Sequence, residues 1–254
     1  MKLLHDSWLL FRWNMRATLR NPIWTIIGLF QPLCYLFLFA PLLNGISQVP
    51  GFPPGGALTV FTPGLMIMMG IFGTAFAGFE LLAELRAGVI ERLRVTPVSR
   101  LALLLGRVLR DVVILLFQSL LLVLIALPLG IHVSPVGLVF ILVLLILLGL
   151  CMTSCSYALA LGLKDENSLS SLLTTLTLPI MLLSGITLPL TLAPPVLRIV
   201  AAFNPFSYAV SAARMLFLNG NLTDVTVIES FAIMGILALL AIVWAERAFR
   251  HAAA

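Results

Sequence analysis

The chain has 254 residues, of which 61% are hydrophobic and 10% charged, and its formal net charge is +5 with a mean hydropathy of +1.14. A soluble protein carries roughly a quarter charged residues, so this chain lacks the polar surface that water would require. The basic residues lie at the ends of apolar runs, which indicates membrane topology and excludes a nucleic-acid-binding face. Composition therefore predicts one all-α integral membrane domain over residues 1–254.

The first predicted element is an N-terminal amphipathic helix over residues 1–21. Its apolar residues recur at helical spacing, and they are Leu4, Trp8, Phe11, Met15 and Leu19. The polar residues lie mostly opposite, and they are Lys2, Asp6, Arg12, Arg16 and Arg20. This pattern is typical of a helix that lies in the membrane interface. A simple basic anchor for the first span is the alternative.

Six apolar segments are predicted to span the membrane, because a helix needs about 20 apolar residues to cross the hydrocarbon core. They are residues 22–43, 61–83, 108–130, 135–163, 168–190 and 225–247. With the N-terminus in the cytosol, every Lys and Arg except Arg198 and Arg214 falls on the cytosolic side. Basic residues favour the cytosolic side, so both termini are predicted to be cytosolic.

The outer segment of residues 191–221 contains two apolar stretches that are too short to cross. Pro194–Pro195 and Asn204–Pro205 bracket the first of them. Backbone breaks at membrane depth are tolerated only where protein or a wet cavity covers them. We therefore predict one or two short re-entrant helices on the outer side.

The stretch from Glu84 to Arg110 is a basic island between two long apolar runs. Its arginines are Arg86, Arg92, Arg94, Arg100, Arg107 and Arg110. Val89 and Leu93 share one face of a predicted short cytosolic helix, which Thr96–Pro97 ends because Pro disfavours helical geometry in the residue before it. Such a helix suits a groove on a partner protein. A loop that only sets topology is the alternative.

Charged residues also mark the inner ends of the second and third predicted spans. Glu80 and Glu84 are one turn apart at the inner end of the second span, and Arg107 and Asp111 are one turn apart at the inner start of the third. One interpretation is a set of ion pairs that anchor helix ends. The other is a cytoplasmic gate whose contacts break and re-form.

Small and hydroxylated residues gather in the second and fifth predicted spans. Gly70, Thr74, Ala77 and Gly78 make a small-residue ridge in the second span, and Ser171, Thr174, Thr175 and Thr177 make a polar patch in the fifth. Small and hydroxylated residues let membrane helices approach closely. The same residues would suit the lining of a translocation pathway, so both interpretations stay open.

Several motifs are missing from the sequence. It contains no GxxxxGK[ST] phosphate loop and no HExxH motif. Its carboxylates near the spans lie at their ends, whereas ion-driven carriers place one at mid-membrane. We therefore predict no catalytic residue, no metal site and no cofactor in this chain, and no energy source of its own.

The basic island resembles a known family. The sequence ELRAGVIERLRVTPVSR from Glu84 to Arg100, followed by Gly106–Arg107, is similar to the membrane subunits of type-two ABC exporters. The likeness is to daunorubicin-resistance and nodulation lipo-oligosaccharide permeases. A second match precedes the last span and comprises Leu183 to Ile186, Pro189, Pro194–Pro195, Asn204 to Tyr208 and Arg214.

The resemblance implies an exporter that moves an amphipathic drug, lipid or lipid-like compound across the bacterial cytoplasmic membrane. In that family two permeases assemble with two copies of a separate ATPase, which binds ATP and Mg. Residues 84–100 would form a coupling loop in the ATPase groove. The coupling residues would be Glu84, Arg86, Gly88, Val89, Glu91, Arg92, Leu93, Thr96 and Pro97. A passive channel or membrane scaffold without an ATPase partner is the alternative function.

Overall fold

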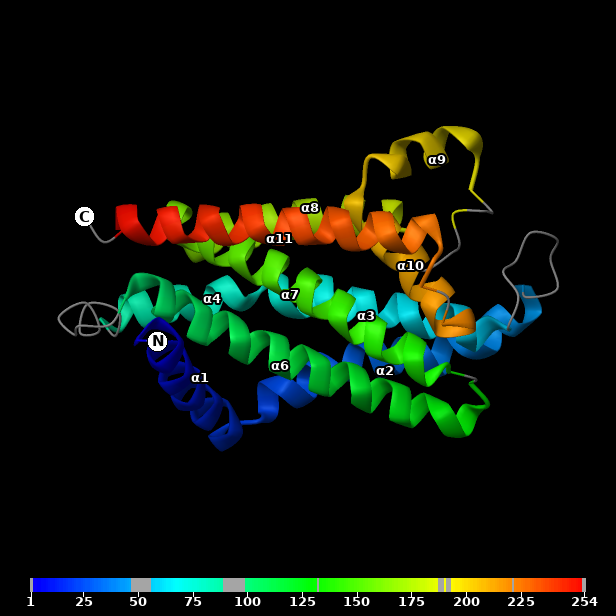
Figure 1. The fold of residues 1–254 in the computed structure, drawn as a ribbon, viewed down its shortest axis with the longest axis horizontal. Helices are drawn as coiled ribbons and strands as arrows, with labels where there is room; N and C mark the ends of the chain where they lie inside the picture. The colour runs from blue at the N-terminus through cyan, green and yellow to red at the C-terminus, as the bar shows by residue number, and fades with distance from the viewer. Residues whose placement is uncertain are drawn as a thin grey trace.

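A computed structural model describes residues 2–46, 56–88, 99–131, 133–186, 190, 193–220 and 222–252. Within these ranges every regular element is a helix, and the long helices run side by side in an elongated bundle (Figure 1). The order along the chain is α1 (Lys2–Arg20), α2 (Ile23–Ile46), α3 (Ala57–Ala75), α4 (Ala77–Arg86), α6 (Arg100–Ala126), the short 3₁₀ helix η1 (Leu127–Leu129), α7 (Pro135–Leu163), α8 (Glu166–Leu183), α9 (Pro195–Ala202), α10 (Pro205–Asn219) and α11 (Val225–Ala252). The all-α prediction is confirmed.

Four described helical segments are long and apolar enough to cross a membrane. They are Leu58–Arg86, Leu101–Leu129, Pro135–Leu163 and Val225–His251. The number rises to six if two bent pairs each form one span. These pairs are Leu3–Arg20 with Thr25–Leu38, bent by 70°, and Pro195–Ala202 with Pro205–Leu218, bent by 100°. The chain is a multi-pass membrane protein, and the predicted six-span arrangement stays a prediction.

The fifth predicted span corresponds to α8, which is not among these four segments. This helix has 18 residues and ends at Leu183, before the predicted limit at residue 190. It is less apolar than α7 because it carries many hydroxyl groups. The exposed ones belong to Ser168, Ser170, Ser171, Thr174 and Thr175.

The helix α7 lies at the centre of the bundle and packs against α3, α4, α6, α10 and α11. Its Leu144 and Leu148 are fully buried in the same apolar cluster as Leu65 and Ile67 of α3 and Leu115 of α6. Because lipid tails are as apolar as Leu, close packing rather than removal from water holds such helices together. The central α7 therefore positions the helices around it.

The helix α10 lies at the end of the bundle opposite the end of α4 (Figure 1), and its Arg214 ties it to α3 and to the residues that follow α8. Its Nε donates to the carbonyl of Val60 in α3 at 3.0 Å. Its Nη2 donates to the carbonyls of Gly185 and Ile186, at 2.7 and 3.1 Å. These two carbonyls follow the end of α8, where the helix can no longer supply partners. Arg214 is therefore a cross-link of this end.

The helix α1 packs on α6 at the end of the bundle where α4 ends and α6 begins, which we call the basal end (Figure 1). Gly106 permits the close approach, because a Cβ there would lie 2.6 Å from the Cβ of Leu10. Ser7 and Asn14 are buried on this side of α1. Residues of the predicted apolar stripe point outward and are exposed, namely Leu4, Trp8 and Leu19. An interfacial position of α1 on the membrane stays a prediction.

Candidate functional site

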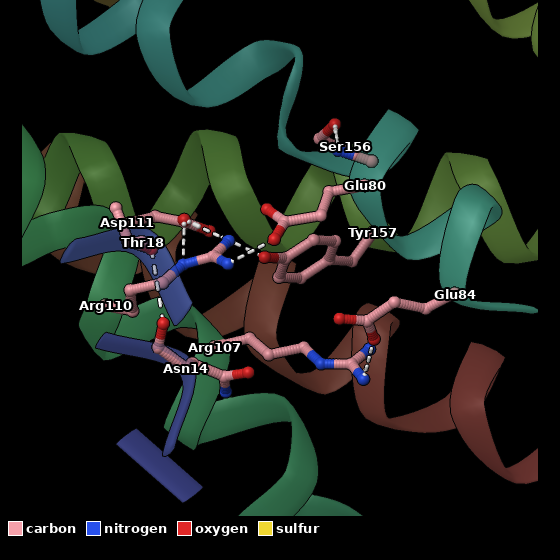
Figure 2. Close-up of polar contacts among 10 residues, drawn as sticks. Asn14, Thr18, Glu80, Glu84, Arg107, Arg110, Asp111, Ser156 and Tyr157 are labelled. Atoms are coloured by element: carbon pink, nitrogen blue, oxygen red, sulfur yellow. Dashed lines mark hydrogen bonds and ion pairs between the residues drawn. The ribbon is translucent and has the colours of Figure 1, made fainter. Parts of the chain in front are cut away.

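A cluster of charged residues joins α4, α6 and α7 at the basal end (Figure 2). Its members are Glu80 and Glu84 on α4, Arg107, Arg110 and Asp111 on α6, and Tyr157 on α7. We call it the basal charge cluster. Arg107 and Arg110 lie on one side of α6 because they are three residues apart, and each is only 4% exposed. Charges buried to this degree require partners.

Arg110 is the centre of the cluster. Its Nη1 lies 2.6 Å from Oε1 of Glu80 on α4. Its Nη2 and Nε donate to Oδ1 of Asp111, at 2.6 and 2.9 Å. The other oxygen of Asp111 accepts a hydrogen bond from the hydroxyl of Tyr157 on α7, at 2.6 Å. One continuous chain of contacts therefore links α4 through α6 to α7.

Arg107 forms a second link between α4 and α6. Its Nη2 makes an ion pair with Oε2 of Glu84. Its Nη1 is buried, and no residue in the described part of the chain accepts a hydrogen bond from it. A buried donor without a partner costs about 1–3 kcal/mol. The guanidinium of Arg107 therefore has fewer hydrogen-bond partners for its buried nitrogens than that of Arg110.

A weaker contact holds the end of α4 to α8. Nη1 of Arg86 lies 3.0 Å from Oε1 of Glu166, and the two side chains are 57% and 41% exposed. An exposed pair of this kind contributes about 0–1 kcal/mol. The backbone then turns at Gly88, whose φ of 68° lies in the left-handed region that glycine tolerates. Residues 89–98 follow and lie outside the described ranges, so the predicted coupling helix stays a prediction.

Asp165 fixes the start of α8, where Glu166 is positioned. Its Oδ2 accepts hydrogen bonds from the hydroxyl and the amide of Ser168, at 2.7 and 2.8 Å. These bonds favour the ionised carboxylate and hold the pKa of Asp165 below its usual value. Asp165 is thus an N-cap of α8.

The structure brings together all four residues of the predicted gate, which are Glu80, Glu84, Arg107 and Asp111. The ion pairs that bind α4 run to α6, whereas the spacing had indicated contacts within each helix. Sequence reasoning missed Arg110 and Tyr157 as site residues. The signal for Arg110 was its position one turn after Arg107. The signal for Tyr157 was the polar run around it in an otherwise apolar span.

The predicted pathway residues do not share one surface of the single chain. Thr74 is buried, and its hydroxyl donates to the carbonyl of Gly70 in the same helix. Ser171, Thr174 and Thr175 are exposed on α8. Hydroxyl groups gain no partner from lipid tails, so this face of α8 suits water or another protein surface.

Comparison with known proteins places this helical membrane bundle in a family. Residues 5–218 match the ABC-2 type transporter family, and the chain belongs to that family. Relatives called transport permease ycf38 are each 29% identical to it. That of Cyanophora paradoxa matches over 204 residues, which are 80% of this chain and 70% of the relative. That of Pyropia yezoensis matches over 214 residues, which are 81% of this chain and 72% of the relative. That of Porphyra purpurea matches over 207 residues, which are 79% of this chain and 69% of the relative. The expectation of a type-two ABC permease is confirmed.

Proposed function

We propose that this chain is the permease subunit of an ATP-driven ABC exporter. It moves an amphipathic drug, lipid or lipid-like compound outward across a bacterial cytoplasmic membrane, and a separate ATPase binds ATP and Mg. Family membership supports the permease role. The observation that carries the proposal is the basal charge cluster, because it fixes α4 where the coupling loop of residues 84–100 begins.

In this proposal the basal charge cluster is the cytoplasmic gate. A force on the coupling loop acts first on α4, which ends at Arg86. Glu80 and Glu84 hold α4 to α6, so α4 can leave α6 only when both ion pairs open. Of the two pairs, that of Arg107 with Glu84 is the buried one, and leaving a buried charge without its partner costs about 3–5 kcal/mol. The gate therefore stays closed until the ATPase supplies energy.

The length of α6 is compatible with charges at the membrane boundary. Its candidate span, Leu101–Leu129, has 29 residues, which is about 43 Å at 1.5 Å per residue. The hydrocarbon core is only about 30 Å thick, so the first turns of α6 can lie at headgroup level. Arg107 and Arg110 are less costly there than at mid-membrane. Together with the arginines of α1 and α11 they favour a cytosolic basal end and cytosolic termini.

The exposed face of α8 supports a second permease copy as a partner. Thr174 and Thr175 lie on one side of this helix with Leu178 and Leu182, which are 57% and 66% exposed. A two-fold contact would bring this face of each copy together. Its hydroxyls, including that of Ser171, would then line a pathway between the subunits. Thr74 is buried in α3 and would reach such a pathway only after α3 moves.

Co-purification tests this proposal. We expect the tagged permease, extracted in mild detergent, to retain an ATPase that carries a phosphate loop. The combined change Leu93→Asp with Glu91→Arg should leave insertion intact and remove the ATPase, because it alters the apolar ridge and charge of the coupling helix. Arg198→Gln on the exposed α9 is the control and should retain the ATPase.

The outcomes separate the two functions kept open by the sequence. An ATPase retained by the Leu93→Asp, Glu91→Arg variant would refute the docking role of residues 84–100. If the unaltered permease retains no ATPase and ATP drives no flux in reconstituted vesicles, the passive channel or scaffold is favoured instead.

A further inference from the structure

The candidate span Leu58–Arg86 is interrupted at Phe76, between α3 and α4. In a continuous α-helix the carbonyl of Ala75 would accept from the amide of Phe79, and the amide of Gly78 would donate to the carbonyl of Thr74. The amide of Phe79 instead donates to the carbonyl of Phe76, at 3.1 Å. The carbonyls of Thr74 and Ala75 and the amide of Gly78 thus lose their helical partners. The amide of Phe76 donates to the carbonyl of Thr74, which leaves the carbonyl of Ala75 and the amide of Gly78 in need of partners.

One side chain on α7 supplies both partners. The hydroxyl of Ser156 donates to the carbonyl of Ala75 and accepts from the amide of Gly78, the latter at 2.9 Å. Figure 2 shows Ser156 at the link between the two helices. Within a membrane span, freed backbone groups require protein or water as partners, and Ser156 is itself buried. The central helix α7 thus stabilises the break.

Gly78 completes this contact. A Cβ at position 78 would lie 2.7 Å from the backbone oxygen of Ser156 and 2.8 Å from its hydroxyl oxygen. Contacts this short would force α4 away from α7. Because glycine has no Cβ, the hydroxyl of Ser156 can approach the backbone at the break between α3 and α4.

We propose that Ser156 is a positioning residue that sets the direction in which α4 leaves α3. The break lies one turn before Glu80 and two turns before Glu84. Each residue turns an α-helix by about 100°, so a changed bond pattern at the break rotates both carboxylates together. Ser156 thereby aligns them with Arg110 and Arg107. The role of α4 as a lever in transport rests on the proposed function, whereas its position does not.

Ser154 offers a matched control two residues earlier on α7. It is fully buried, and its hydroxyl oxygen has no hydrogen-bond partner among the described residues. Removing the hydroxyl of Ser154 therefore breaks no bond to α3 or α4. Removing that of Ser156 breaks two.

Distances between spin labels test the proposal on the permease alone, in lipid nanodiscs without an ATPase. Labels replace Ala83 on α4 and Arg247 on α11, both exposed, after Cys34, Cys151 and Cys155 have been changed to alanine. A second pair replaces Leu109 on α6 and Arg247 and serves as the reference.

With Ser156→Ala we expect the Ala83–Arg247 distance distribution to shift by several ångströms and to broaden, while the reference pair stays unchanged. Ser154→Ala should change neither pair. An unchanged Ala83–Arg247 distribution in Ser156→Ala would overturn the proposal.

A second variant covers the case in which Ser156→Ala does not fold. Gly78→Ala keeps the hydroxyl of Ser156 and adds no thiol, but its Cβ would lie 2.7 Å from the backbone oxygen of Ser156; a shift of the same pair is therefore expected, and no shift overturns the proposal equally. The measurement contains no ATPase. A failed co-purification therefore leaves its result standing, and a failed distance test leaves the proposed function standing.

Discussion

Arg107 of α6 and Glu84 of α4 form an ion pair between two helices at the point where the proposed coupling loop begins. Their side chains are 5% and 20% exposed, so little water is available to replace either partner. Two residues near opposite ends of the basic island thus hold α4 against α6 at the basal end.

Glu84→Gln should destabilise the permease strongly. It leaves the guanidinium of Arg107 buried without a carboxylate, which we expect to cost about 3 kcal/mol. Thermal unfolding in detergent, followed by tryptophan fluorescence, measures the change in Tm. The matched control is Arg86→Gln, which removes an exposed pair and should cost less than about 1 kcal/mol. Equal losses in the two variants would contradict the special role of the Glu84 pair.

Glu80→Gln should be milder than Glu84→Gln. The side chain of Glu80 is 54% exposed, and Arg110 keeps its two bonds to Asp111 when Glu80 is neutral. We expect a loss of about 1 kcal/mol, at the upper end of the range for exposed pairs. The same unfolding measurement ranks the two variants. A larger loss in Glu80→Gln than in Glu84→Gln would contradict this ranking, because it would show that Arg110 depends on its carboxylate partner on α4 more than Arg107 does.

Tyr157→Phe should weaken the link between α6 and α7. It removes a hydrogen bond to the carboxylate of Asp111, and hydrogen bonds to charged groups contribute about 1.5–3 kcal/mol. Tyr208→Phe is the control, because the hydroxyl of Tyr208 makes an exposed bond of 3.2 Å to the carbonyl of Ala202. We expect a clearly lower Tm only for Tyr157→Phe, and indistinguishable melting of the two would count against this link.

Arg214→Met should damage the opposite end of the bundle. It leaves the carbonyls of Val60, Gly185 and Ile186 without their donor, at about 1–3 kcal/mol for each buried group. We expect little monodisperse protein by size-exclusion chromatography. Arg214→Lys should recover part of it, because one ammonium cannot reach all three carbonyls. Full recovery with methionine would show that these contacts are dispensable.

The apolar runs made much of the helical fold predictable, because span length depends on local composition alone. The match is poorest for α8, where hydroxyl groups interrupt the apolar pattern and Leu183 ends the helix early. Exposure of those hydroxyls depends on which helices surround α8. The helices that surround α8 come from distant parts of the chain, so the local sequence of α8 does not predict which of its hydroxyls are exposed.

The candidate site was predictable in its residue types but not in its pairs. Spacing along one helix relates Arg107 to Asp111, whereas the observed partner of Arg107 is 23 residues away. Tyr157 is 46 residues from Asp111. The role of Ser156 was hidden for a similar reason, since no proline marks the break at Phe76 and the bonds come from another helix.

Opening of the contact between α4 and α6 during each ATP-driven cycle is the central claim. In a chain whose own cysteines have been replaced, Glu84→Cys and Arg107→Cys allow a short, reducible thiol reagent to join the two helices. The permease with its co-purified ATPase is reconstituted in vesicles, and MgATP hydrolysis is measured before joining, after joining and after reduction. Single-cysteine variants control for the reagent. We predict that joining stops coupled hydrolysis and that reduction restores it, whereas an unchanged rate with the helices joined would contradict the claim.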